Sequence, residues 1–246
     1  TEHVGGMIAL IEKLLREGVP GNEIAVLYRA NFLSRAFEEA FLISGLPYHL
    51  VGTTFYERKE VKDALAYLRA AMNPADTLSF ARIANTPRRG IGSLTLDAVL
   101  SGRESDLRGA VQEKLSGVRR LLARIAEQSL HVPPSALVRY ALKESGLEAM
   151  LLESEEDEER LQNARELATL ATRYDSFPRE EGLGRFLSDT ALLSDQDSLT
   201  EAGSGVRLMT VHAAKGLEFQ QVFVVGLEEG LFPHHRRDER DELEAM

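Results

Sequence analysis

The sequence contains no cysteine, which excludes disulfide bonds and thiolate zinc sites and fits a reducing compartment. No apolar run approaches the roughly 20 residues that a helix needs to cross a bilayer. The first residues also lack the basic and then apolar pattern of a signal peptide. We therefore expect a soluble, cytoplasmic chain without a membrane partner. It begins at Thr1 rather than at Met, which we interpret as a fragment or a processed form.

The motifs that hold phosphate and magnesium in nucleotide hydrolases are also missing from these 246 residues. No G-x-x-x-x-G-K-[ST] loop occurs, and the only Lys-Gly neighbours are Lys215 and Gly216, which lack the following hydroxyl residue. No acidic pair follows a hydrophobic strand as a Walker B motif would. The sequence therefore predicts no metal ligands and disfavours a self-contained nucleotide-hydrolysing enzyme.

What is present suits a globular chain, because 43% hydrophobic residues supply a sizeable core for one large domain or two small ones. The net charge of -10 argues against a nucleic-acid partner, since phosphate binding favours Lys and Arg. Residues 88–128 are the exception, with eight basic and five acidic side chains. Any electrostatic attraction of a nucleic acid would therefore be confined to this segment.

Hydrophobic periodicity predicts alternating helices and strands at both ends of the chain and helices alone in the middle. The short, continuous apolar run at residues 24–28 is typical of a strand covered on both faces of a parallel sheet. The other expected elements are helices at 4–17, 33–44 and 61–72, helical periodicity from 93 to 193, and strands at 47–51, 206–211 and 221–225.

The resulting fold class is α/β, with one parallel-sheet domain formed by both ends of the chain and interrupted by an all-α insertion. We expect the sheet domain to comprise residues 1–87 and 206–246, and the insertion to comprise residues 88–205. Residues 201–205 have the composition of the returning linker.

Candidate chemistry lies where strands end, because ligands collect at the carboxyl ends of parallel strands. Tyr28 and Arg29 follow the first strand, and an aromatic ring can stack on a nucleobase while a guanidinium grips phosphate. Taken alone, a Tyr-Arg pair is more typical of an ordinary surface.

A longer motif changes that interpretation. Residues 208–219 read LMTVHAAKGLEF, and residues 222–233 continue with VFVVGLEEGLFP. This run closely resembles motif V of the UvrD/PcrA/Rep-type superfamily 1 DNA helicases. Three further segments resemble that family: IAVLYRAN at 24–31 is similar to motif IV, FYERKE at 55–60 to an accessory motif, and NTPRRGIG at 85–92 to the opening of the inserted 2B domain.

The resemblance implies that this chain is a RecA-like 2A domain interrupted by 2B, carrying half of an ATP site. Tyr28 would stack on adenine, and Arg29 would reach the γ-phosphate as an arginine finger, the catalytic residue of this half. Glu218 would bind the ribose, and Gly216 would allow close backbone approach. A preorganised guanidinium suits the charge that develops on a transferring phosphoryl group, and a carboxylate accepts from ribose hydroxyls.

The resemblance also implies DNA contacts. Single-stranded DNA would be held by Thr210, His212 and Arg58, although Arg58 also fits a salt-bridged helix start with its neighbouring glutamates. A duplex junction would be held by Arg88, Arg89, Gly90, Ile91 and Gly92. Glycines before a helix start permit close phosphate approach, yet the same pattern also occurs as a simple turn.

The function implied is that of the C-terminal motor half of an ATP-dependent DNA helicase or translocase, of 3′ to 5′ polarity in this family. ATP and Mg²⁺ would bind only in the complete enzyme, together with the N-terminal RecA-like half, so this chain alone is expected to be inactive. The alternative is a non-catalytic module that binds DNA or protein. His234 and His235 are interpreted as a surface loop, and the acidic run at 153–159 as a solvated helix start.

Overall fold

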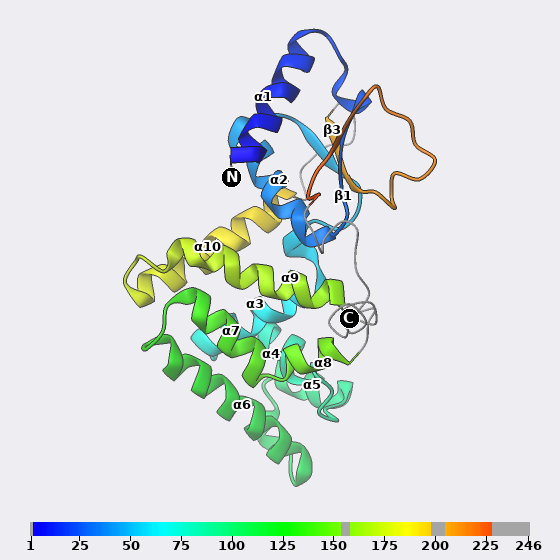
Figure 1. The fold of residues 1–246 in the computed structure, drawn as a ribbon. Coiled ribbons are helices and arrows are strands. Elements are labelled where there is room, and N and C mark those ends of the chain that lie inside the picture. Colours follow the sequence, from blue (N-terminus) through cyan, green and yellow to red (C-terminus); the bar gives the residue numbers. More distant parts are fainter. Residues whose placement is uncertain (1, 154–157, 198–204, 228–246) are drawn as a thin grey trace, which may run out of the picture. The chain divides into compact units, whose positions relative to one another are not determined.

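The computed structural model describes residues 2–153, 158–197 and 205–227, and the chain divides into two compact units. The sheet unit comprises Thr1–Phe55 and Gln196–Met246, and the helical unit comprises Tyr56–Asp195. Within the described residues, the sheet unit contains α1 (Glu2–Arg16), β1 (Ile24–Tyr28), α2 (Ser34–Ser44), β2 (Tyr48–Leu50), β3 (Val206–Thr210) and β4 (Gln221–Val224) (Figure 1).

The sheet has the strand order β2-β3-β1-β4, and all its pairings are parallel. β1 lies between β3 and β4, with Tyr28 opposite Thr210 in the register. The expected strand at residues 24–28 is confirmed without a shift. β1 is central because its apolar side chains are buried on both faces of the sheet.

The core of the sheet unit lies between one sheet face and the helices α1 and α2. Alternate β1 residues point into it, as expected for a strand with a side-chain period of two. The cluster unites Met7, Ile8, Ile11, Ile24, Val26, Tyr28, Phe37, Phe41, Tyr48, Val206 and Leu208. α2 ends at Gly45, whose φ of +67° favours glycine and closes the helix.

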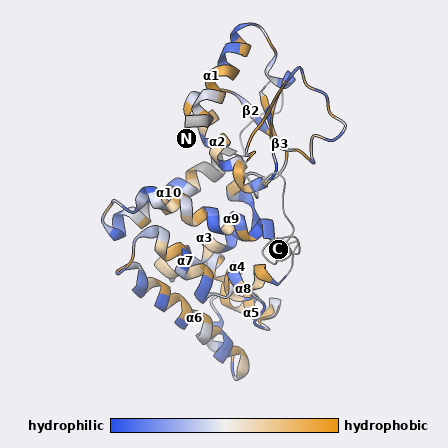
Figure 2. Cartoon of the chain, viewed as in Figure 1, coloured by the Kyte–Doolittle hydropathy of each residue, from blue (hydrophilic) through white to orange (hydrophobic). Residues whose placement is uncertain are grey.

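The described part of the helical unit contains α3 (Lys59–Met72), α4 (Thr77–Ala84), α5 (Ser93–Leu100), α6 (Ala110–Ser129), α7 (Pro134–Glu144), α8 (Leu147–Leu152), α9 (Glu158–Ala171) and most of α10 (Arg179–Asp197), which continues past Asp195. Most of these helices are amphipathic. Apolar and polar residues alternate along α6, whose apolar side packs inward (Figure 2). α3 differs in its surroundings, because it packs against α4, α6, α7 and α9 and is buried on nearly every side.

The predicted α/β class is confirmed, with a sheet unit formed by both ends of the chain and a middle that is helical throughout its described residues. The compact helical unit begins at Tyr56, whereas the inserted domain is predicted to begin at residue 88. The reason is the packing of α3, which is enclosed by the later helices of the middle segment. The division into 2A and 2B at residue 88 therefore stays a prediction.

No helix in the described ranges is both long and apolar enough to span a membrane. The features predicted at residues 201–204 and 228–233, at His234 and His235, and in the acidic run at 154–157 lie outside the described residues.

Candidate functional site

The carboxyl ends of β1 and β3 bring together residues that are 183 positions apart in the sequence. Arg29 follows β1 directly, and His212 follows β3 by two positions. Nη1 of Arg29 lies 3.3 Å from Nδ1 of His212. Arginine carries donors and no acceptor, so Nδ1 of His212 accepts and the ring proton lies on Nε2. The Nε2–H group is then a donor available to a further acceptor.

The turn after β3 is held by short-range hydrogen bonds. Val211 N donates to Tyr28 O at 2.9 Å, which ties this turn to the end of β1. The Thr210 hydroxyl accepts from Ala213 N at 3.2 Å. Ala214 N donates to Thr210 O at 3.1 Å. The turn therefore fixes Thr210 and His212 beside Arg29.

Gly216 and Glu218 lie farther along the same turn. Gly216 has a φ of +85°, which L side chains rarely adopt, while the space around its Cα is open. Its conformation rather than crowding within this chain therefore requires glycine. Glu218 is exposed, and no hydrogen bond or ion pair of its carboxylate is found within the described residues.

Tyr28 is predicted to stack on adenine, and in this structure its ring is buried. The ring is 1% exposed and stacks on Phe37 with a centroid distance of 6.1 Å and an interplanar angle of 11°. Both residues belong to the hydrophobic core. Stacking on a base therefore requires the Tyr28 ring to be uncovered, whereas Arg29 already extends beyond the core.

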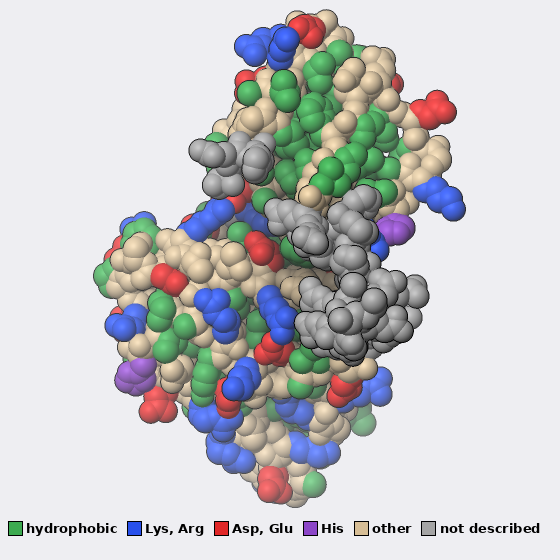
Figure 3. All heavy atoms as spheres, in the orientation of Figure 1, with side chains coloured by type: hydrophobic (Ala, Val, Ile, Leu, Met, Phe, Trp, Pro, Cys, Tyr) green, Lys and Arg blue, Asp and Glu red, His purple; other side chains and the backbone are tan. Residues whose placement is uncertain are grey.

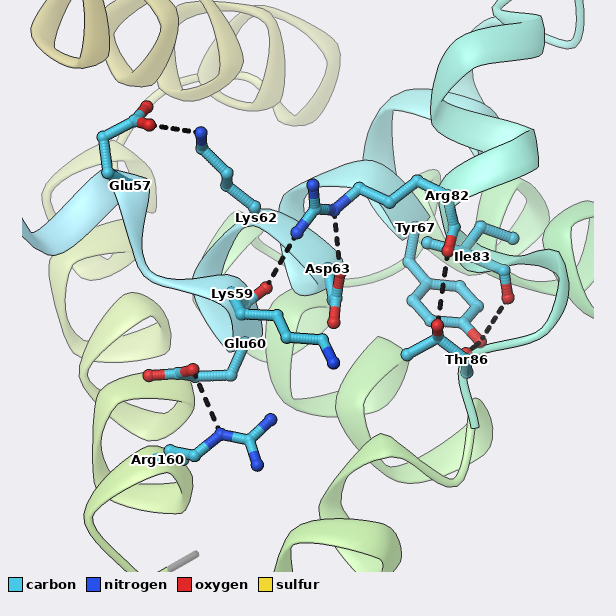
Figure 4. Close-up of polar contacts among 10 residues, drawn as sticks. All are labelled: Glu57, Lys59, Glu60, Lys62, Asp63, Tyr67, Arg82, Ile83, Thr86 and Arg160. Carbon is cyan, nitrogen blue, oxygen red and sulfur yellow. Dashed lines mark hydrogen bonds and ion pairs between the residues drawn. The ribbon is translucent and has the colours of Figure 1, made fainter. Parts of the chain in front are cut away.

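The residues predicted to contact DNA outside this strand end all belong to the helical unit. Arg58 is 7% exposed, and its Nη1 donates to Asn163 Oδ1 at 2.8 Å. Asn163 in turn donates to Glu60 Oε1 at 2.6 Å, and Arg160 pairs with the other oxygen of Glu60 at 3.4 Å. This chain of contacts joins the start of α3 to α9, and Figure 4 shows Glu60 and Arg160 facing each other.

Arg89 is also used inside the fold. Nη2 donates to the Tyr67 hydroxyl at 2.7 Å and to Ser145 O at 2.8 Å. Nη1 donates to several carbonyls in the last turn of α4 and in the segment that follows it, including those of Ile83 and Thr86 at 3.0 Å each. Burial raises the pKa of the Tyr67 phenol above its ordinary value, although the neighbouring guanidinium lowers it. Both terminal nitrogens of Arg89 are thus committed to intramolecular partners.

The segment at residues 85–92, which we call the Gly90 loop, is organised by a residue to which the sequence assigned no role. Asn85 Oδ1 accepts from Arg89 N at 2.7 Å and from Ile91 N at 3.2 Å. Asparagine side chains commonly bond nearby backbone in this way, so a signal existed in the Asn-Thr-Pro sequence. Ile91 is 2% exposed and anchors the loop. Gly90 and Gly92 are exposed on either side of it.

The two glycines of the loop differ in backbone conformation. Gly90 has a φ of +69°, in the region that favours glycine. Gly92 has an extended conformation with a φ of -85°, precedes the first residue of α5, and has open space around its Cα. Arg88, which precedes Arg89 in this loop, is exposed, and none of the described residues pairs with its guanidinium.

A buried carboxylate of α3 completes the polar contacts of the helical unit. Asp63 Oδ1 accepts from Arg82 Nε at 2.7 Å, and the same guanidinium also donates to Lys59 O at 3.2 Å (Figure 4). Asp63 Oδ2 is buried without a hydrogen-bond partner. Burial raises the pKa of the Asp63 carboxyl, and this outweighs the opposing effect of Arg82. Within the described residues, no cluster of three or more His, Asp or Glu could hold a metal ion.

The sequence as a whole matches the family model described as the UvrD-like helicase C-terminal domain over residues 2–245. It is 38% identical over 239 residues to the ATP-dependent DNA helicase PcrA of Bacillus subtilis (strain 168), which covers 87% of this chain and 32% of that protein. It is 39% identical over 234 residues to DNA helicase II of Escherichia coli (strain K12), which covers 86% of this chain and 32% of that protein. The chain thus spans about a third of the length of the curated relatives it matches.

Proposed function

The chain belongs to the UvrD-like helicase C-terminal domain family, and from this we propose that it is the C-terminal motor half of an ATP-dependent DNA helicase or translocase. The observation that carries the proposal is the meeting of Arg29 and His212 at the carboxyl ends of two adjacent parallel strands. A nucleotide-binding residue and a DNA-binding residue of the motor would thus lie side by side at the same edge of the sheet.

In this proposal the chain supplies part of an ATP site whose phosphate loop and magnesium ligands belong to an N-terminal RecA-like half. Arg29 stabilises negative charge on the transferring phosphoryl group, and Glu218 accepts from the ribose. Gly216 permits close approach of the backbone. Tyr28 packs behind Arg29, and it contacts adenine only if its ring is uncovered when the two halves assemble.

The DNA part of the proposal places single-stranded DNA on Thr210 and His212. The Nε2–H group of His212 is a neutral donor suited to a phosphate oxygen. The Gly90 loop, with Arg88 beside it, would hold the backbone of a duplex junction. For Arg58 and Arg89 we propose structural roles in place of the predicted DNA contacts, because their donors are engaged within the helical unit.

Translocation would then follow from closure of the two halves on ATP and their opening after hydrolysis. These movements would step single-stranded DNA across the two halves. The 3′ to 5′ polarity is proposed from the family resemblance alone.

The proposal is tested by Arg29→Ala in the enzyme that contains both halves. An arginine finger contributes about 10³-fold or more to kcat, so we expect a loss on that scale with a much smaller change in nucleotide affinity. Arg29→Lys should not restore kcat, since a point charge lacks the planar guanidinium. Steady-state ATPase with saturating single-stranded DNA measures both.

Arg16→Ala is the matched control, because Arg16 is an exposed arginine in the last turn of α1. It should leave kcat unchanged. A near-normal kcat in Arg29→Ala would instead favour a non-catalytic module that keeps the helicase fold for binding.

A further inference from the structure

Lys114 reaches the Gly90 loop from a distant part of the helical unit. It lies on α6, 24 positions after Gly90, and its Nζ donates to Gly90 O at 3.1 Å. Both residues are exposed. The contact therefore places an ammonium group on the outer surface of the loop rather than within the core.

The absence of a side chain at Gly90 makes this contact possible. A Cβ atom built on Gly90 would lie 2.6 Å from the Lys114 ammonium, closer than real Cβ contacts allow. The φ of +69° is what favours glycine at this position, whereas a Cβ atom would only displace the flexible end of the Lys114 side chain from its present place.

The ammonium keeps unused hydrogen-bonding capacity. A lysine ammonium has three N–H donors, and one of them is directed at the carbonyl of Gly90. Arg119, another cation of this region, differs from Lys114 because it pairs with Glu104 and stacks over Phe80. Together with the exposed Arg88, Lys114 is thus available to an anion that approaches the loop.

The surrounding surface favours an anionic polymer. Lys and Arg side chains gather around the end of the helical unit that contains α5 and α6 (Figure 3). The segment 88–128 carries eight basic and five acidic residues in a chain whose net charge is -10. Such a local excess is the pattern by which a protein attracts a phosphate backbone.

We propose that Lys114 is a further phosphate-binding residue of the duplex-binding surface formed by the Gly90 loop. The carbonyl of Gly90 orients its ammonium toward a backbone phosphate of double-stranded DNA. This inference rests on the proposed function of the Gly90 loop. Because phosphate contacts carry no base information, the contribution of Lys114 should be the same for all duplex sequences.

The first test compares Lys114→Met, which keeps an unbranched apolar stem, with the wild-type chain. Binding to a labelled duplex with a single-stranded tail is followed by fluorescence anisotropy over a range of salt concentrations. Loss of one phosphate contact should weaken binding roughly three- to tenfold and lower the salt-dependence slope by about 0.9. Lys114→Arg should retain the slope.

Lys143→Met is the matched control, because Lys143 is an exposed lysine in the last turn of α7 in the same unit. It should change neither affinity nor slope. Wild-type affinity and slope in Lys114→Met would overturn the assignment of Lys114 as a phosphate-binding residue. A wild-type chain that does not bind the duplex would instead overturn the proposed duplex binding by the Gly90 loop.

A second test combines Lys114→Met with Gly90→Ala. The added Cβ displaces the ammonium, so part of the loss caused by Gly90→Ala should disappear when Lys114 is already replaced. The two losses should therefore be less than additive. Circular dichroism melting checks that each variant is folded at the temperature of the binding assay. Strict additivity in folded variants would contradict the coupling of Gly90 and Lys114.

Discussion

The two units use their polar residues in opposite ways. In the sheet unit, Arg29 and His212 extend beyond the core and contact each other at a strand end. In the helical unit, Arg58 and Arg89 turn inward and hold helices and loops together. The donors of an arginine within a family motif can therefore point outward or into the fold, and we propose that this direction distinguishes a ligand-binding role from a structural one.

Arg89→Ala should give the largest loss of stability. It leaves the carbonyls of Ile83, Thr86 and Ser145 and the hydroxyl of Tyr67 without their charged donor. We expect the free energy of unfolding of the helical unit to fall by about 3 kcal/mol. Urea unfolding followed by far-ultraviolet circular dichroism measures the change.

The adjacent Arg88→Ala is the control for that experiment, because Arg88 is exposed. Its effect on stability should stay within about 0.5 kcal/mol. If Arg89→Ala were as stable as Arg88→Ala but bound duplex DNA poorly, the structural role proposed for Arg89 would be wrong. The result would then support the phosphate contact predicted from the sequence.

Arg58→Ala should have the next largest effect. It removes the donor to Asn163 and disturbs the buried link to Glu60, so the unfolding free energy should fall by about 2 kcal/mol. Binding of a single-stranded oligonucleotide by folded protein should be unchanged. The exposed Lys59→Ala provides the comparison at the neighbouring position.

A direct role of Arg58 in holding single-stranded DNA predicts the reverse outcome. In that case the oligonucleotide affinity would fall while the midpoint of urea unfolding stayed at the wild-type value. This result would place Arg58 with Arg29 and His212 among the residues for which we propose ligand binding.

Asp63→Asn should have the smallest effect. Burial raises the pKa of Asp63 in the folded state, so its contribution to stability is fully present below the unfolded pKa, near 3.8, and is lost as the pH rises through the folded value. Asparagine does not ionise and can still accept from Arg82, whose side chain is 38% exposed.

The unfolding free energy of Asp63→Asn at neutral pH should therefore lie within about 1 kcal/mol of the wild-type value. The difference between variant and wild type should move in favour of the variant between acidic and neutral pH. Asp97→Asn, at an exposed position on α5, should show no such change. A difference that moved against the Asp63→Asn variant as the pH rose would contradict the dominance of burial.

Local sequence patterns predicted the elements of the sheet unit well. The apolar run at 24–28 is β1, and the run after residue 205 is β3, because a strand buried in a parallel sheet is apolar on both faces. The family motifs also indicated which residues follow these strands. Their positions after two strands were compatible with a contact between Arg29 and His212. Predicting that contact would have required the register of β1 and β3, which the sequence does not give.

The helical unit was less predictable because its decisive contacts join distant positions. The stripe of Val61, Leu65 and Leu68 indicated one buried face of α3, yet Glu60 and Asp63 on other faces are buried as well. Their partners come from α9 and α4, and periodicity carries no information about such pairings. For the same reason, the sequence pattern could not predict the contact between Lys114 and Gly90.

If this chain contributes only part of a motor, as we propose, the purified chain should not hydrolyse ATP by itself. The measurement combines the chain with ATP, Mg²⁺ and single-stranded DNA, and records phosphate release against a blank without protein. We predict no turnover above the blank, because residues 1–246 contain no phosphate-binding loop. DNA-stimulated turnover that persists through repurification would contradict the account.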